Sequence, residues 1–371
     1  MNRKLKLAIV GSGNAGCITA MHFYYYGRDI FDIEIYHDPN SPIEKVGQAT
    51  TLDIPKLIHD VFDLDWINQS KYLRATRKDG IMYENWGKKV DKFTHSFCLS
   101  DISFHYVPEL LSKLVLESGF FKVIEKNISN PEIEIDCDFI IDCRGRHDRD
   151  KDLYENLINP LNSVIVGKKN NPDISLSYTR SVATPDGWTF VIPNYDSVSY
   201  GYLYNRNITD KEVAEKNIKN IFDVDPIFGL DFENYIAKNC YYGQRTFLNG
   251  NRLSFLEPLE ATSSSFYSYA ARCFWDHIVD KVPKDTCNIN LRKEMKKIET
   301  FILWHYQKGS KYDTPFWDYA KSLPFFVDTD FQLQIDKCKS GDMISCKRNS
   351  MGYSQWGTNS FKYWVDNTYE E

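Results

Sequence analysis

The chain contains nine cysteines but has no CxxC pair and no Cys/His cluster at the spacing of a zinc site. An odd number of thiols in 371 residues indicates reduced cysteines instead of a disulfide framework. Long hydrophobic runs are also missing. The apolar run Leu7–Val10 near the N-terminus is too short for a signal sequence or a membrane span. These absences predict a soluble, cytoplasmic protein with no membrane association.

Positive charge is in deficit, since 45 Lys and Arg are set against 51 Asp and Glu, giving a formal net charge of −6. No segment forms a dense basic stripe, so nucleic acid is a poor candidate partner. The motifs HExxH and GxSxG, the P-loop and the kinase signatures are absent as well. The sequence therefore predicts no metal site and no serine chemistry.

Aromatic residues are abundant, at 15% of the chain with 24 Tyr, 23 Phe and 8 Trp. Such a content suits a flat aromatic ligand, although composition alone favours an aromatic-packed core. The length predicts two domains, or one domain with a large insertion.

The first forty residues predict a βαβ unit. Its expected parts are a strand, a glycine turn, a helix and a second strand, at Lys6–Val10, Gly11–Gly16, Cys17–Tyr26 and Asp32–Tyr36. A later apolar run, Asp138–Ile141, is typical of another buried parallel strand.

The turn Gly11-Ser12-Gly13-Asn14-Ala15-Gly16 has the GxGxxG spacing of dinucleotide-binding proteins. The first glycine makes the turn, the second lets a diphosphate approach the backbone, and the third permits close packing of helix and strand. Gly11, Gly13, Ala15 and Gly16 are therefore predicted cofactor contacts. Asp38 is the best candidate for the ribose hydroxyls, although His37 occupies the more usual position.

The middle of the chain predicts an antiparallel sheet, and the part after about Ser264 predicts helices. The expected strands are rich in β-branched and aromatic residues and lie at Ser175–Val182, Trp188–Ile192 and Ser197–Tyr204. The clearest helical pattern is Leu291–Lys308.

The βαβ unit alone fits a flavin or a nicotinamide cofactor, and the segment Gly187–Pro193 (GWTFVIP) distinguishes between the two. It resembles the GWxWxIP signature of the flavin-dependent halogenases of the tryptophan-halogenase type, with Phe190 in place of the second Trp. In that family the segment runs beside the flavin, which implies that Trp188, Ile192 and Pro193 contact the cofactor. Without the other matches, an ordinary aromatic-rich strand would be the better interpretation.

A second match is Phe255–Ser263 (FLEPLEATS), which resembles the segment that opens a helix near the flavin in this family. The resemblance implies that Thr262 and Ser263 bind halide at the helix start and that Glu260 reaches the substrate pocket. Ser263 stands where the family usually has glycine, so its side chain is expected to alter the shape of the halide site. Taken alone, Glu260 is a carboxylate in the first turn of a helix, favoured by the helix dipole.

A third match, Ala75–Trp86, resembles the family's segment in which a lysine is followed by Gly-Ile and then Asn-Trp. The alignment implies that Lys78 is the essential catalytic lysine. Its neighbours Arg77 and Asp79 would otherwise indicate a solvated charged turn.

Two further segments resemble the family. Glu44–Thr50 is similar to its VGEAT strap, with Gln48 replacing the glutamate, and implies cofactor contacts at Gly47 and Ala49. Phe301–Tyr306 and Asp313–Trp317 are similar to a helix and loop that have a structural or pocket-lining role.

The resemblance implies an α/β fold of the flavin hydroxylase and halogenase superfamily: a Rossmann-type FAD-binding domain with an antiparallel sheet and a helical substrate-binding part. The expected division is a FAD-binding module at 1–263, with 60–105 contributing to the substrate pocket, and a mainly helical substrate-binding part at 264–371. Base rates add an expectation of a homo-oligomer.

The implied activity is halogenation of an aromatic small molecule. Reduced FAD from a separate, freely diffusing flavin reductase would, with dioxygen and halide, yield hypohalous acid for delivery through Lys78, with Glu260 assisting. The chain is shorter than the family's tryptophan halogenases, so an indole, a phenol or a carrier-bound aromatic is the expected substrate. Two alternatives stay open: a flavin-dependent aromatic monooxygenase, and a catalytically inactive flavin-binding protein.

Overall fold

The structure is a computed structural model that describes residues 3–41, 43, 47–97, 103–146, 150–170, 177–341 and 353–369. The chain forms two compact units. Unit 1 consists of Met1–Arg77, Ile102–Leu157 and Tyr235–Met295, and unit 2 of Lys78–Asp101, Ile158–Asn234 and Lys296–Glu371. The sequence predicted a single boundary after residue 263, whereas the chain passes between the units five times. A division of function at residue 263 stays a prediction.

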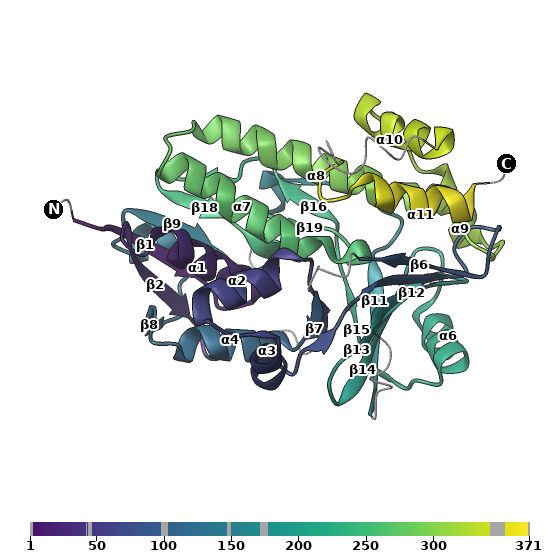
Figure 1. Ribbon diagram of the computed structural model, residues 1–371, viewed down its shortest axis with the longest axis horizontal. Helices are drawn as coiled ribbons and strands as arrows, with labels where there is room; N and C mark the ends of the chain where they lie inside the picture. Colours follow the sequence, from purple (N-terminus) through teal and green to yellow (C-terminus); the bar gives the residue numbers. More distant parts are fainter. Residues whose placement is uncertain are drawn as a thin grey trace. The chain divides into compact units, whose positions relative to one another are not determined.

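Unit 1 is built on a six-stranded sheet (Figure 1). Its strands, in spatial order, are β17 (Tyr241–Tyr242), β18 (Thr246–Leu248), β9 (Phe139–Asp142), β1 (Leu5–Val10), β2 (Phe31–His37) and β8 (Lys122–Glu125). The five strands from β18 to β8 are parallel, and β17 is antiparallel to β18. Leu7–Val10 of β1 is buried on both faces, as expected for a continuous apolar run in the interior of a parallel sheet.

Unit 1 also contains helices. They are α1 (Asn14–Gly27), α2 (Asp53–Phe62), α3 (Trp66–Leu73), α4 (Pro108–Glu117), α5 (Pro131–Glu134) and α7 (Thr262–Ile278). Helix α1 packs on β1 and β2 and is flanked by α2, α4 and α7 (Figure 1). In α2 the buried side chains Ile54, Leu57, Ile58 and Val61 recur at helical spacing, which explains why this segment forms a helix against the core.

Two small sheets complete unit 1. One joins β3 (Gln48–Ala49), β7 (Phe104–Tyr106) and β4 (Thr76–Arg77); the other joins β10 (Tyr154–Asn156), β16 (Tyr235–Ala237) and β19 (Ser254–Phe255). Single-turn 3₁₀ helices occur at η1 (Lys151–Leu153), η2 (Gly250–Arg252) and η3 (Leu259–Ala261).

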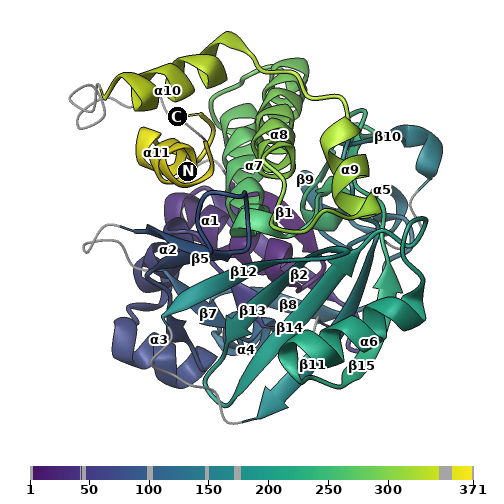
Figure 2. The same ribbon diagram turned by 90° about the vertical axis from the view of Figure 1, so that its right-hand side faces the viewer.

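Unit 2 contains a seven-stranded sheet (Figure 2). Its strands, in order, are β15 (Pro226–Asp231), β11 (Ser163–Asn170), β14 (Ser197–Tyr204), β13 (Gly187–Pro193), β12 (Tyr178–Thr184), β5 (Gly80–Glu84) and β6 (Lys92–Ser96). Strand β12 is antiparallel to β13 and parallel to β5. This pairing draws the β5–β6 hairpin into unit 2, although its sequence lies between two parts of unit 1.

One face of this sheet is covered by α6 (Lys211–Phe222), with Ala214 and Ile218 packed on Val191 and Tyr202 (Figure 2). The remaining helices of unit 2 are α9 (Pro315–Ser322), α10 (Thr329–Ser340) and α11 (Thr358–Thr368). Helix α8 (Lys284–Gln307) begins in unit 1 and ends in unit 2.

Aromatic side chains form much of the core of unit 2. The rings of Phe301 and Trp356 stack with centroids 3.7 Å apart, and His305 lies 4.2 Å from Trp364. Nδ1 of the buried His305 lies 2.8 Å from the carbonyl oxygen of Phe301, and its Nε2 lies 3.4 Å from the hydroxyl of Tyr83. A large share of the aromatic content therefore serves packing, and His305 is a satisfied core histidine.

The predicted elements are confirmed where the structure describes them. The βαβ unit is β1, α1 and β2; the later parallel strand is β9; the antiparallel strands are β12, β13 and β14; and the helical pattern of Leu291–Lys308 is the larger part of α8. Residues 175 and 176 of one predicted strand lie outside the described residues. Within the described part of the chain, no helix has both the length and the apolar character needed to cross a membrane.

Candidate active site

The glycine turn joins β1 to α1 in unit 1, and its three glycines have different surroundings. Gly11 has a φ of +108°, and a Cβ there would lie 2.8 Å from the carbonyl oxygen of Cys143. A Cβ on Gly16 would lie only 1.9 Å from the carbonyl oxygen of Gly11. A Cβ on Gly13, in contrast, would meet no heavy atom within 4 Å. The turn is thus closed against the protein at Gly11 and Gly16 and open at Gly13.

This arrangement fits the diphosphate of a dinucleotide such as FAD. Gly13 is the N-cap of α1 and has no side chain that could accept a hydrogen bond from the first amides of the helix. The first amides of α1 therefore point towards the open side of the turn, where the helix dipole favours an anion. A side chain at residue 13 would fill the space that a diphosphate needs.

His37 is the last residue of the neighbouring strand β2, and Asp38 follows it. The amide of Gly11 donates to the carbonyl of Tyr36, so the end of β2 lies beside the turn. Nδ1 of His37 is 3.5 Å from the hydroxyl of Ser12, whereas the Asp38 carboxylate accepts from the amide of Asn40. Both residues therefore lie at the end of β2 beside the glycine turn, where the ribose of the cofactor is predicted.

The strap segment lies against α1 through β7. Gln48 and Ala49 pair with Tyr106 and His105, and the hydroxyl of Tyr106 donates to Oδ1 of Asn14 in the glycine turn at 2.8 Å. Gly47 and Ala49 are buried here, while residues 44–46 of the predicted strap lie outside the described residues. No sequence pattern predicts the Tyr106–Asn14 contact, because the two residues are 92 positions apart.

The strap also reaches the start of α7, since the hydroxyls of Thr51 and Ser264 lie 3.5 Å apart. The backbone is unusual at this helix start: Glu260 and Ala261 have φ values of +68° and +56°, in the left-handed region. Thr262 returns to the right-handed region, and Ala261 offers no side-chain cap. A left-handed residue followed by a right-handed one turns successive amides to one side, which makes a small anion-binding concavity. Thr262 and Ser263 are the residues at this position.

Lys78 lies in unit 2, between Arg77 and the first residue of β5. Its side chain is only 1% exposed, and Nζ lies 5.3 Å from the centre of the Phe97 ring. Burial, followed by the charge of Lys78 and the nearby His305 ring, lowers the pKa of His95 to about 4, which places His95 in the field of Lys78 as a neutral base at pH 7. The sequence interpretation identified Lys78 but missed His95 and Phe97.

Strand β13 carries the GWTFVIP segment, and all seven of its residues are buried. The rings of Trp188 and Phe190 lie on one face with centroids 6.3 Å apart. Phe190 covers Gly201 of β14 so closely that a Cβ on Gly201 would lie 2.0 Å from the ring. The opposite face carries Val191, which packs under α6. Trp188, Phe190 and Ile192 therefore share the face that α6 does not cover.

Within unit 2, the register brings the end of β13 to the Lys78 end of the sheet. Arg180 of β12 is paired with Val191 on one side and with Met82 on the other. Counting two residues along each strand places Pro193 in the row of Tyr178 and Gly80, and Gly80 is two residues after Lys78 in the chain.

The predicted residues thus fall into two groups. Unit 1 contains Gly11, Gly13, Ala15, Gly16, Asp38, Gly47, Ala49, Glu260, Thr262 and Ser263, and unit 2 contains Lys78, Trp188, Ile192 and Pro193.

A parallel sheet with a glycine turn and an uncapped helix start, together with a second, mainly antiparallel sheet, defines a dinucleotide-binding fold of the flavoprotein type. The sequence pattern described as tryptophan halogenase matches residues 6–113 and 115–357. The chain therefore belongs to the tryptophan halogenase family, whose members are flavin-dependent oxidoreductases.

Individual relatives agree with this assignment. The chain is 21% identical to tryptophan 7-halogenase RebH of Lentzea aerocolonigenes over an alignment of 473 positions including gaps. The alignment covers 98% of this chain and 88% of that protein. The structure of MibH, a lanthipeptide tryptophan 5-halogenase, superimposes with a TM-score of 0.81 at 17% identity, over 98% of this chain and 86% of that one. The halogenase BrvH of Brevundimonas sp. BAL3 gives a TM-score of 0.80 at 18% identity, over 99% and 90%. The predicted family and fold class are confirmed.

Proposed function

We propose that the protein halogenates a small aromatic substrate of the indole or phenol type. One observation carries the proposal within this family: the near-complete burial of Lys78 beside Phe97 and the neutral His95. Burying an ammonium group is costly, so a lysine in a merely solvated turn would be exposed. Arg77, its neighbour in the same charged run, is exposed.

FAD is the cofactor of the proposal. The backbone amides after Gly11, Gly13, Ala15 and Gly16 would hold its diphosphate, and Asp38 is the candidate for its ribose. Reduced FAD, supplied by a separate diffusing reductase, would react with dioxygen and oxidise halide by two electrons to hypohalous acid. The second oxygen atom of dioxygen would be released as water. The amides of Thr262 and Ser263 are the candidate halide ligands.

Lys78 has the role of delivering the halogen. Its ammonium donates a hydrogen bond to the oxygen of hypohalous acid, which draws electron density away from the halogen. The ring attacks the halogen, a carbon–halogen bond forms, and the halogen–oxygen bond breaks. Glu260 accepts the proton lost from the ring, while the departing hydroxide takes a proton from the Lys78 ammonium and leaves as water. Return of the proton from Glu260 to Lys78 restores both side chains.

The aromatic face of β13 has the role of separating the cofactor from the substrate. Trp188 and Phe190 lie next to each other on that face, with ring centroids 6.3 Å apart. In the proposal, these two rings leave room for a halide but not for an aromatic ring. Keeping the ring away from the flavin confines the chemistry to the oxidant that reaches Lys78.

Tryptophan is the substrate named for RebH and MibH. For this chain the proposal is broader, because it includes phenols and substituted indoles. The substrate panel should therefore contain tryptophan, free indoles, phenols and a carrier-bound aromatic.

The test incubates the protein with a flavin reductase, NADH, FAD, dioxygen and this panel, with chloride, bromide and iodide offered separately. We expect a halogen mass shift in at least one substrate, absent when halide is omitted. An oxygen adduct that forms equally without halide would instead identify an aromatic monooxygenase. FAD binding without any product would identify an inactive flavin-binding protein.

A further inference from the structure

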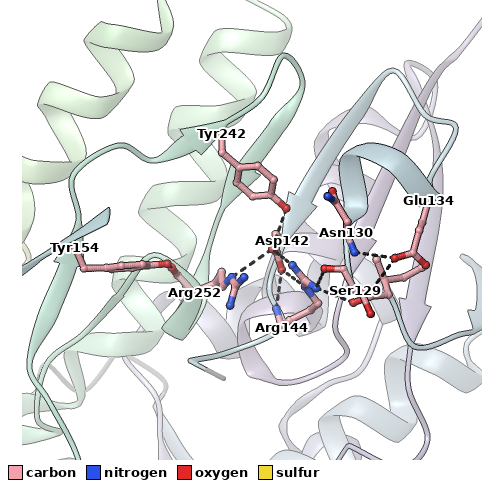
Figure 3. Close-up of polar contacts among 9 residues, drawn as sticks. Ser129, Asn130, Glu134, Asp142, Arg144, Tyr154, Tyr242 and Arg252 are labelled. Carbon is pink, nitrogen blue, oxygen red and sulfur yellow. Dashed lines mark hydrogen bonds and ion pairs between the residues drawn. The ribbon is translucent and has the colours of Figure 1, made fainter. Parts of the chain in front are cut away.

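A buried polar cluster lies at the carboxyl end of β9 in unit 1 (Figure 3). Its centre is the carboxylate of Asp142, which is completely buried. Arg144 approaches it with two parallel bonds, Nε to Oδ1 at 2.9 Å and Nη2 to Oδ2 at 2.7 Å. Nε of Arg252 lies 3.4 Å from Oδ2, and the hydroxyl of Tyr242 donates to the same oxygen at 3.3 Å. Burial and Asp142 raise the pKa of Tyr242, so this hydroxyl keeps its proton.

The two arginines differ in what they do. Arg144 also donates from Nη1 to the carbonyls of Ile128 and Ser129, at 2.6 and 2.8 Å. Nε, Nη1 and Nη2 of Arg144 thus all donate to protein acceptors. Arg144 alone balances the charge of Asp142. With Arg252 included, the three formal charges sum to +1 in a mostly buried setting, since the Arg144 and Arg252 side chains are 21% and 14% exposed.

Arg252 is fixed next to the glycine turn. It ends η2, whose first residue, Gly250, packs so closely on α1 that a Cβ there would lie 2.4 Å from the Cβ of Ala15. The preceding Asn249 donates from Nδ2 to the hydroxyl of Thr19 on α1 and from its amide to the carbonyl of Asp142. The carbonyl of Arg252 itself accepts from the hydroxyl of Tyr154 (Figure 3).

The other side of the cluster also meets the turn. Asp142 pairs with Val10, the residue before Gly11, and the carbonyl of Cys143 is the atom that closes the turn at Gly11. The positive cluster and the open amides of α1 therefore stand at the same end of the parallel strands, where dinucleotides bind in such sheets.

We propose that Arg252 binds the diphosphate of the dinucleotide cofactor and that Asp142, with Arg144, is the positioning pair that holds it there. A guanidinium suits this task because its planar donors match phosphate oxygens in pairs. The inference rests on the proposed FAD site, and it adds a side-chain contact to a site otherwise made of backbone amides.

The experiment titrates four probes into the wild type and into Arg252→Met: FAD, riboflavin, ADP and adenosine. Riboflavin and adenosine carry the two ends of FAD without the diphosphate. Loss of one charge-assisted contact should weaken FAD and ADP by about 10- to 100-fold. Riboflavin and adenosine should change by less than about twofold, because neither carries the group that Arg252 contacts. Arg252→Lys should recover part of the affinity for FAD and ADP through its point charge.

Arg292→Met is the matched control, because Arg292 pairs with Glu155 at the surface of the same unit. It should leave all four affinities unchanged. The inference is overturned if Arg252→Met binds FAD and ADP as the wild type does, or if it weakens riboflavin and adenosine equally, which would indicate a structural role. ADP also separates this inference from the proposed function: ADP binding that depends on Arg252 supports it even if no halogenation occurs, and a wild type that binds neither FAD nor ADP contradicts it.

Discussion

Two glycines of the cofactor turn should respond in opposite ways to the same substitution. At Gly16 an alanine Cβ would lie 1.9 Å from the carbonyl oxygen of Gly11, a backbone atom that cannot swing aside. At Gly13 the same Cβ would meet nothing within 4 Å. Gly16→Ala should therefore damage the folded protein, and Gly13→Ala should damage only its complex with FAD.

The magnitudes follow from these contacts. Relieving the clash at Gly16 requires the start of α1 to move, with an expected loss of about 1–3 kcal/mol in the free energy of unfolding. At Gly13, alanine is a poorer N-cap than glycine, which lowers the free energy of unfolding by up to about 1 kcal/mol. Alanine also reduces the conformational freedom of the unfolded chain, which raises the free energy of unfolding by about 0.4–1 kcal/mol. The net change in stability there should be within about 0.5 kcal/mol. If the new methyl group overpacks the bound diphosphate by about 1–3 kcal/mol, FAD affinity falls by about 5- to 150-fold.

The assay pairs urea unfolding of both apoproteins with titrations of FAD. Equal stability losses in the two variants would refute the assigned surroundings of the glycines. Wild-type FAD affinity in Gly13→Ala would refute the position of the diphosphate.

Three further predictions concern stability. Ala261→Gly should raise the free energy of unfolding by about 1 kcal/mol in urea, because residue 261 is in the left-handed region at φ +56°; a loss would contradict the backbone assigned to the start of α7. Burial, and then the positive charge of Arg272, lowers the pKa of His22 to about 4, so stability present above the unfolded-chain pKa of about 6.5 is lost as the pH falls towards 4. We expect His22 to contribute about 1–2 kcal/mol of the loss between pH 7 and pH 5, and His22→Phe to remove that part; an unchanged pH profile in the variant would show that His22 is not the group responsible. Tyr202→Phe should cost about 1–3 kcal/mol in urea, since its hydroxyl donates to the buried carboxylate of Asp186 at 2.5 Å, and a neutral result would mean that Thr209 and Asn217 satisfy that carboxylate alone.

The sequence predicted the parts of the fold that are encoded locally. A continuous apolar strand followed by GxGxxG is enough to predict β1, the turn and α1, because each glycine has a separate backbone task. The antiparallel strands were predicted for a similar reason, since β-branched and aromatic runs alternate with turn residues.

The remaining parts depend on pairing between distant segments. Nothing in residues 78–101 indicates that β5 pairs in parallel with β12, and this pairing assigns Lys78 to unit 2. The environment of Lys78 was missed because only the pairing of β5 with β6 brings His95 and Phe97 back towards it. The role proposed for Arg252 could not be predicted either, since it depends on a contact with Asp142, which lies 110 positions earlier in the chain.

The measurement that tests the central claim most directly is a single turnover with reduced FAD, halide, dioxygen and the best substrate of the panel. It compares the wild type with Lys78→Met and with Arg77→Met, the neighbouring exposed cation. We predict that all three proteins reoxidise the flavin, while Lys78→Met alone forms no carbon–halogen product. Halogenated product in Lys78→Met at the wild-type yield would contradict the role assigned to Lys78.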